Sequence, residues 1–168
     1  METIWQDLTR GMGGGEEMTR VVFRLLAALV AGAFIGYQRE WERKAAGLRT
    51  HILVTVGACL LVLAGGASGL SGDGLSRIVQ GIVTGIGFLG AGTILKLDQE
   101  RAIRGLTTSA GIWVTSAIGV AIGLGLVGVA FIATILSVIV LALVKPLEAE
   151  LPRTRLIETD EKGIVKRE

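Results

Sequence analysis

The sequence predicts an all-α protein that crosses a membrane about five times. Apolar residues make up 51% of the 168 residues and charged residues only 19%, against roughly 25% charged residues in an average soluble domain. Uncharged apolar stretches of about 18 residues or more indicate membrane spans. Four windows contain no Asp, Glu, Lys or Arg, namely 25–38, 52–70, 78–95 and 106–144. The spans are expected to be helical, because a lone strand in lipid leaves its backbone groups unpaired.

The same composition excludes several classes of protein. A soluble enzyme domain divides its core into shorter apolar pieces with polar faces, and a disordered chain is poor in apolar residues. Cys59 is the single cysteine, so a secreted scaffold held by intrachain disulfides is excluded. The net charge of +2 is too small to indicate a nucleic-acid partner.

The chain divides into three parts. Residues 1–20 form a polar, Gly-rich segment that lacks the basic and then apolar stretches of a cleaved signal peptide. Residues 21–145 form the membrane domain, whose first span is expected over 21–38, with Arg24 near its start able to reach the interface. Residues 146–168 form a charged cytoplasmic tail.

The later spans follow the charge-free windows. The second is expected over 52–70 and the third over 78–95. The window 106–144 is too long for one span of about 20 residues. Glycines cluster near its middle, so we expect a turn near Gly125 between a fourth and a fifth span.

The distribution of basic residues predicts the orientation. With five spans, the N-terminus, the loop 71–77 and the turn near Gly125 share one side, which carries four Lys and Arg residues, and the other side carries thirteen. Cytoplasmic loops carry the excess of Lys and Arg. The N-terminus is therefore expected outside and the C-terminus inside the cell.

Glycine is the main signal inside the spans, with 25 glycines in 168 residues, about twice the usual share of ~7%. Two small residues four apart on a helix let another backbone approach closely. Such pairs are Gly32 with Gly36, Gly81 with Gly85, and Gly119 with Gly123. They indicate either tight packing within the chain or a face for self-association, and the two readings are compatible.

Residues 85–92 (GIGFLGAG) contain the pattern G-x-G-x-x-G. We reject a dinucleotide site, because that site needs a preceding strand and a soluble crevice. Gly85, Gly87, Gly90 and Gly92 are instead expected to weaken or bend the third span. Backbone groups freed in this way could bind an ion.

The loop 38–51 has two readings. It either sets the topology, with Trp41 as an interface anchor, or forms a structured turn. In the second reading Gly47 permits a tight turn and Arg49 donates to carbonyls at helix ends. His51 has no second His or Cys at ligand spacing, so a transition-metal site is not indicated.

Asp73 and Arg77 lie four apart at the start of the third span. Asp73 is expected to cap a helix or to pair with Arg77; a weaker hypothesis makes Asp73 an outward-facing ligand of a hard cation.

Uncharged polar residues in the spans are expected to bond across helices. They include Gln80, Thr84, Thr107, Thr108, Thr115 and Ser116. No acid or base lies deep in a span and no nucleophile has a base nearby, so neither catalysis nor a cofactor is indicated.

Three blocks resemble the MgtC/SapB family of bacterial inner-membrane proteins. The first is Arg39-Glu40 followed by 46–51 (AGLRTH), the second runs from Arg77 to 85–92, and the third is 104–110 (RGLTTSA) followed by Trp113. The chain departs from the family pattern at Gln38, where an acid is usual, and at Gly81, where some members have Gln. Longer members also carry a soluble cytoplasmic domain after the last helix.

The resemblance implies a multi-pass protein of the bacterial inner membrane linked to magnesium limitation and, in pathogens, to survival inside host cells. It also implies binding to other membrane proteins, including the proton-driven ATP synthase. The positions expected to matter most are Arg39, Glu40, Gly47, Arg49, Asp73, Arg77, Gly85, Gly87, Gly90, Gly92, Thr107 and Thr108.

Two functions compete. The favoured one is a non-enzymatic membrane regulator that binds partner membrane proteins, in agreement with the small-residue faces and the charge-free spans. The alternative is a divalent cation (Mg²⁺) transporter or channel subunit, which needs a polar path through the bundle or across an oligomer.

Overall fold

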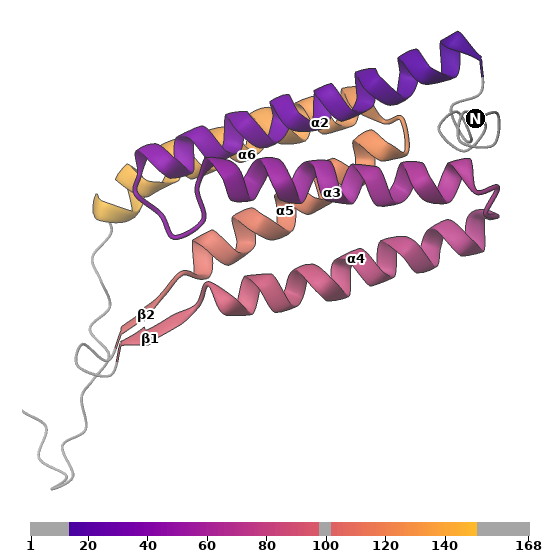
Figure 1. Ribbon diagram of the computed structural model, residues 1–168. Helices are drawn as coiled ribbons and strands as arrows, with labels where there is room; N and C mark the ends of the chain where they lie inside the picture. Colours follow the sequence, from indigo (N-terminus) through magenta and orange to yellow (C-terminus); the bar gives the residue numbers. More distant parts are fainter. Residues whose placement is uncertain (1–13, 98–101, 151–168) are drawn as a thin grey trace, which may run out of the picture.

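A computed structural model describes residues 14–97 and 102–150, and it shows five helices that lie lengthwise beside one another (Figure 1). They are α2 (Gly15–Trp41), α3 (Leu48–Ala67), α4 (Gly72–Gly92), α5 (Leu106–Gly123) and α6 (Val127–Glu150). Successive helices run in opposite directions along the bundle (Figure 1). The predicted helical membrane fold is confirmed.

Four of these helices, α2 to α5, are long and apolar enough to cross a membrane, and α6 adds a shorter apolar stretch over Val127–Leu143. The turn between α5 and α6 falls at Gly125 as predicted, and Gly125 has a φ of +87°, which favours glycine. The start of α2 and the end of α6 lie at opposite ends of the bundle (Figure 1). A chain that crosses a membrane five times has its two ends on opposite sides, in agreement with this arrangement. Which end faces the cytoplasm stays a prediction.

Three helices begin earlier than the charge-free windows, and α6 runs past residue 145 to Glu150. The first turn of α2 carries Glu16 and Glu17, and that of α4 carries Asp73. Carboxylates are favourable at the positive end of a helix dipole, so a helix can start among charges that a hydropathy window excludes. The predicted segment 1–20 therefore contributes its last residues to α2, and residues 151–168 of the predicted tail lie outside the described residues.

The connection between α4 and α5 contains a short hairpin that the sequence did not predict. Strand β1 (Leu95–Leu97) pairs antiparallel with β2 (Ala102–Arg104), with Leu95 opposite Arg104 and Leu97 opposite Ala102. Strands of three residues are too short to produce a visible alternation of polar and apolar residues. This hairpin is an addition to an otherwise helical architecture.

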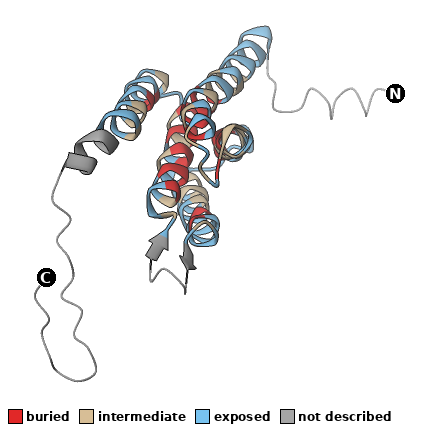
Figure 2. Cartoon of the chain, turned by 90° about the vertical axis from the view of Figure 1, so that its left-hand side faces the viewer, coloured by how far each residue is buried: buried red, intermediate tan, exposed pale blue. Residues whose placement is uncertain are grey.

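The interior holds small and hydroxyl residues together with several isoleucines, and most of the other large apolar side chains face outward. Buried residues gather where the helices face one another (Figure 2). Ala28, Cys59 and Thr55 are fully buried, whereas Phe88 is 83% and Leu53 is 71% exposed. Apolar side chains of a water-soluble protein are preferentially buried, so this distribution fits a molecule whose solvent is lipid.

The hydroxyls within the spans bond differently from the prediction. Thr84 Oγ1 donates to the carbonyl of Gln80 (2.9 Å) and Thr115 Oγ1 donates to that of Gly111 (2.8 Å), each one turn earlier in its own helix. The expected bonds across helices were wrong for these two residues. A hydroxyl that donates to a carbonyl of its own helix needs no hydrogen-bond acceptor from another helix. Its donor is therefore paired even where the helix faces lipid.

Two of the three glycine pairs pack α3 against its neighbours. A Cβ at Gly36 would lie 2.7 Å from the Cα of Leu48, and a Cβ at Gly32 would lie 2.8 Å from the carbonyl oxygen of His51. On α5, a Cβ at Gly119 would collide with the carbonyl oxygen of Thr55. Tight packing within the chain is therefore confirmed for these pairs. Gly81 and Gly85 on α4 have open space around them.

The third span is not broken at its glycines, because α4 is one continuous helix from Gly72 to Gly92; that these glycines weaken or bend the helix stays a prediction. A Cβ at Gly85, Gly87 or Gly92 would meet no atom within 4 Å, while one at Gly90 would lie 2.6 Å from Oγ of Ser109 on α5. A helical glycine costs roughly 1 kcal/mol relative to Ala. Breaking the helix in lipid would leave backbone groups unpaired at several kcal/mol each, so the helix persists.

Candidate functional site

Most residues singled out from the sequence gather at one end of the bundle. The loop after α2, the end of α4, the hairpin and the start of α5 all lie at this end, which we call the loop end (Figure 1). The predicted residues found there are Arg39, Glu40, Gly47, Arg49, Gly90, Gly92, Thr107 and Thr108. Gly85 and Gly87 lie along α4. Asp73 and Arg77 lie near the opposite end, with Asp73 about 30 Å from Thr93 at 1.5 Å per residue.

Glu40 and Gly47 join the end of α2 to the start of α3. The Oε2 atom of Glu40 accepts a hydrogen bond from the backbone N–H of Leu48, the first residue of α3 (3.0 Å). The first N–H groups of a helix have no partner within the helix, so the carboxylate caps α3. A Cβ at Gly47 would collide with this carboxylate oxygen.

The reason for glycine at position 47 differs from the prediction. Gly47 has an extended backbone with a φ of −108°, which any residue adopts. The left-handed residue in this loop is Arg43, with a φ of 53°. Gly47 is therefore required by the approach of the Glu40 carboxylate and not by the conformation of a tight turn.

Arg39 is the most deeply buried charged side chain among the described residues, with 1% of its surface exposed. Its Nη1 donates to Oε2 of Glu42 at 3.3 Å, and Glu42 is itself 13% exposed. The Nε and Nη2 atoms of Arg39 are buried with no hydrogen-bond partner. A buried cation with unsatisfied donors is costly unless something pairs with it.

His51 lies fully buried one helical turn into α3, beside α2 and α5. Its Nδ1 shares a hydrogen bond with the carbonyl oxygen of Gly47 (2.9 Å), and its Nε2 is buried without a partner. A Cβ at Gly36 would lie 3.1 Å from Cβ of His51, and one at Gly111 would lie 3.7 Å from Nε2. Gly36 on α2 thus leaves room for Cβ of His51, while a Cβ at Gly111 on α5 would only touch the imidazole ring.

A cavity of about 390 Å³ lies at the loop end beside Arg39. We call it the basic cavity, because it is lined by four cationic side chains and three threonines and by no carboxylate among the described residues. Its lining is Arg39, Arg43, Lys44, Ala45, Thr93, Arg104, Gly105, Thr107 and Thr108. The first and third family blocks, far apart in the sequence, therefore meet around one cavity.

Three predicted side chains do not join this site. Arg49 is exposed, and the hydrogen bond predicted from its side chain to helix carbonyls is absent within the described residues. Asp73 and Arg77 are both exposed, and the structure records no ion pair between them; α4 is capped by Ser71 without a side-chain bond. Within residues 14–97 and 102–150, no three or more His, Cys, Asp or Glu side chains lie together in a group that could hold a metal ion.

Two other polar residues fasten helices together. Nη1 of Arg24 donates to the carbonyl oxygen of Gly123 at the end of α5 (3.0 Å), where a cation is favoured by the helix dipole. Gln38 Nε2 donates to the carbonyl oxygen of Leu141 on α6 (3.3 Å). The amide of Gln38 thus supplies the donor for this bond. An acid at position 38, which is usual in the family, would have a carboxylate that cannot donate to the carbonyl of Leu141.

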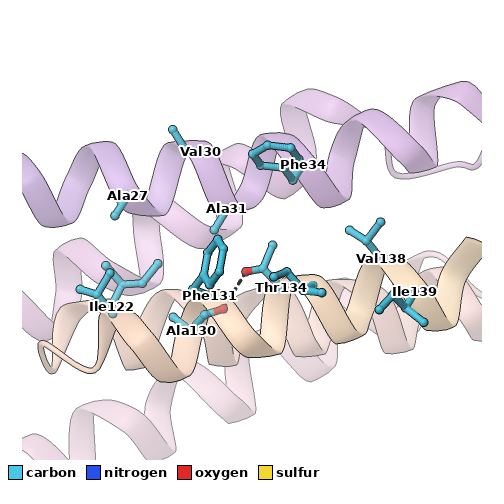
Figure 3. Close-up of a pocket in the computed structure, with 12 residues that line it drawn as sticks. Ala27, Val30, Ala31, Phe34, Ile122, Ala130, Phe131, Thr134, Val138 and Ile139 are labelled. Atoms are coloured by element: carbon cyan, nitrogen blue, oxygen red, sulfur yellow. Dashed lines mark hydrogen bonds between the residues drawn. The ribbon is translucent and has the colours of Figure 1, made fainter.

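An apolar groove lies between α2 and α6, with a cavity of about 430 Å³ (Figure 3). Figure 3 shows Ala31 of α2 and Phe131 of α6 pointing toward one another. The hydroxyl of Thr134 donates to the carbonyl of Ala130 (2.8 Å) and so presents no free donor. Phe34 and Phe131 are 64% and 65% exposed.

Sequence reasoning missed several residues of the loop end. His51 was identified as a lone histidine at a loop end and as the last residue of the first family block, and neither observation indicates that its side chain is buried. Arg104 entered as a charge in the topology count and as the first residue of the third family block, without a predicted place beside Arg39. Gly105 has a φ of +99° at the start of α5 and abuts the carbonyl of Thr93. The G-L-T-T sequence after Arg104 was the available signal for a helix start.

Comparison with known proteins identifies related chains. The MgtC family model matches residues 25–150. Protein SrpB of Synechococcus elongatus is 41% identical over 137 residues, which cover 75% of each chain. Protein MgtC of Salmonella typhimurium is 44% identical over 115 residues, covering 68% of this chain and 48% of the relative. Protein MgtC of Brucella abortus is 44% identical over 124 residues, covering 73% and 50%.

The chain thus spans about half the length of the MgtC proteins that it matches. No solved structure matches it.

Proposed function

This chain belongs to the MgtC family, and we propose that it is a non-enzymatic protein of the bacterial inner membrane that serves magnesium homeostasis by binding other membrane proteins. The family assignment supports the link to magnesium. The match to MgtC and SrpB over most of the chain supports a role carried by the membrane domain itself.

The observation that carries the binding mechanism is the apolar groove between α2 and α6. Small residues, Ala27 and Ala31, lie on the α2 side, and exposed aromatic rings, Phe34 and Phe131, lie beside them. Helices associate in lipid through close packing at small residues. The groove therefore suits a transmembrane helix of a partner, and the family resemblance makes the proton-driven ATP synthase one candidate.

Site-specific photocrosslinking in native membranes tests this proposal. A crosslinker in place of Phe131 should capture one reproducible membrane protein, identified by mass spectrometry, when cells are limited for magnesium. The matched control is Phe88 on α4, which is 83% exposed and lies outside the groove. Adducts with lipid alone, or the same proteins captured from both positions, would contradict the proposal.

Function is tested in parallel by rescue of growth at low magnesium. The double variant Phe34→Ala and Phe131→Ala removes two exposed rings and should insert normally, yet fail to rescue a deletion strain. Phe88→Ala should rescue as wild type does. Full rescue by the groove variant would show that this face binds no essential partner.

The alternative function, a Mg²⁺ transporter or channel subunit, makes a separate prediction. Purified protein in liposomes would then carry Mg²⁺ down a gradient, and Asp73→Ala would reduce the flux if Asp73 is an outward-facing ligand. Hydroxyls at Thr55, Thr115 and Thr134 donate to carbonyls of their own helices. These bonds use the hydroxyl hydrogens and leave the oxygen lone pairs free to face a cation, so the measured flux decides between the two functions.

A further inference from the structure

We propose that the basic cavity binds an anionic phosphate group, carried either by a lipid headgroup or by a soluble phosphate compound. The proposal goes beyond the proposed function, because the cavity lies at the loop end and shares no lining residue with the α2–α6 groove.

The charge of the lining is the first argument. Arg39, Arg43, Lys44 and Arg104 all line the cavity, and no carboxylate does among the described residues. Glu42 bonds to Nη1 of Arg39 and so offsets part of the charge of this arginine, and Arg104 also has an interaction partner. Arg and Lys side chains gathered around one space are the usual receptors for phosphate, with Arg able to donate two parallel hydrogen bonds.

The state of Arg39 is the second and independent argument. Its side chain is 1% exposed, and its Nε and Nη2 donors have no partner. Leaving charged donors buried and unpaired is costly. An anion in the adjoining cavity would offset this buried charge, which gives the buried arginine a physical reason to be there.

The start of α5 supplies further donors. Helix α5 has 18 residues. Its N-cap residue is Gly105, which has no side chain to accept a hydrogen bond from the first turn. The N–H groups of the first turn, which includes Thr107 and Thr108, have no partner within the helix and carry the positive end of its dipole. The hydroxyl of Thr93 already donates to the carbonyl of Gly90 (2.8 Å), so the threonine donors toward an anion come from α5.

The size and position of the cavity define the ligand class. A volume of about 390 Å³ falls within the range of roughly 300–1,000 Å³ for small-molecule sites. The cavity lies at the end of the bundle where Tyr37 and Trp41 are exposed, and such aromatic residues mark the headgroup level of a membrane. Both a headgroup and a soluble phosphate compound can reach this level.

Binding is tested with the full chain in nanodiscs that contain only zwitterionic phosphatidylcholine. Equilibrium dialysis with radiolabelled inorganic phosphate reports a soluble ligand. A second arm uses nanodiscs of phosphatidylcholine and phosphatidylglycerol in equal amounts, and native mass spectrometry counts the anionic lipids that stay bound. Saturable binding in the first arm identifies soluble phosphate, and retained phosphatidylglycerol alone identifies a lipid headgroup; either result supports the site.

Charge-matched variants separate the site from general attraction between basic residues and anions. The double variant Arg43→Gln and Lys44→Gln alters the lining at the edge of the cavity and should weaken binding about tenfold or more. The control, Arg49→Gln with Arg77→Gln, removes the same charge from exposed positions outside the cavity and should bind as wild type does.

Arg39→Met removes the buried cation and should abolish the rise in melting temperature that the bound anion gives the wild type. If this variant does not fold, the pair of double variants still decides. Absence of binding in both arms, or equal weakening by the two double variants, would overturn the proposal.

Discussion

At the scale of single residues, the contact between Glu40 and Gly47 shows how one missing side chain positions a charged cap. The Glu40 carboxylate reaches the N–H of Leu48 only because position 47 has no Cβ. A charged acceptor at a helix N-terminus is worth about 1 kcal/mol or somewhat more. The two residues therefore act as one unit, although they are separated by a whole loop.

A double-mutant cycle tests this unit. Gly47→Ala should displace the Glu40 carboxylate and cost about 1–2 kcal/mol, and Glu40→Ala should cost a similar amount because the same hydrogen bond is lost. The double variant should cost little more than either single one, since the bond can be lost only once. The free energies come from reversible SDS titration in mixed micelles.

The control for this cycle is Gly57→Ala in the same helix α3. A Cβ at Gly57 would meet no atom within 4 Å, so the variant should match the wild type or gain up to about 1 kcal/mol from helix propensity. Additive costs in the cycle would show that Gly47 and Glu40 act independently.

At the scale of the helices, α3 is the central element, and glycines on α2 and α5 let it approach both neighbours closely. Contacts of this kind replace the hydrophobic drive that is missing between helices in lipid. Because the close atoms include backbone carbonyls and Cα atoms, they cannot rotate away as the end of a long side chain can.

Replacement of Gly119 by Ala should therefore separate α5 from α3. The new Cβ would collide with the carbonyl oxygen of Thr55 and would lie 2.9 Å from Cβ of Ala58. Overpacking of this kind costs about 1–3 kcal/mol, which a lower melting temperature in detergent would report.

Gly81→Ala on α4 is the matched control, because its Cβ would enter open space. Equal destabilisation by the two variants would contradict the packing argument. Gly81 and Gly85 form the one predicted pair that no other helix of the chain approaches closely. Crosslinking at these two positions is therefore the best test of the self-association expected from the sequence.

At the scale of the whole molecule, the start of α2 and the end of α6 lie at opposite ends of the bundle. The loop end, which holds Arg39 and the basic cavity, is the end that the count of basic residues assigns to the cytoplasm. Soluble phosphate compounds of the cell and inner-leaflet headgroups would then have access to the cavity.

Fusion reporters test this orientation. A reporter that works only in the cytoplasm should be active when fused after residue 168, and one that works only after export should be inactive there. The same two reporters placed in the loop 68–71 between α3 and α4 should give the reverse result. Export of the C-terminal fusion would invert the topology.

The sequence by itself determined that this protein is a bundle of membrane helices. Long uncharged windows locate the spans, because a charge or an unpaired backbone group in hydrocarbon is too costly. The motif residues around Arg39 and in 104–110 also identify the family from sequence alone. The start of each helix was less well predicted, because carboxylates such as Glu16 and Asp73 are tolerated in a first turn.

Only the tertiary structure decided what the individual residues do. Whether a glycine is needed depends on which atom approaches it, so Gly119 is tightly packed and Gly85 is not, although both belong to the same kind of pair. The burial of His51 and the meeting of Arg39 with Thr108 around one cavity depend on helices far apart in the chain. Residues on separate helices share no sequence period, and their contacts are fixed only when the helices pack.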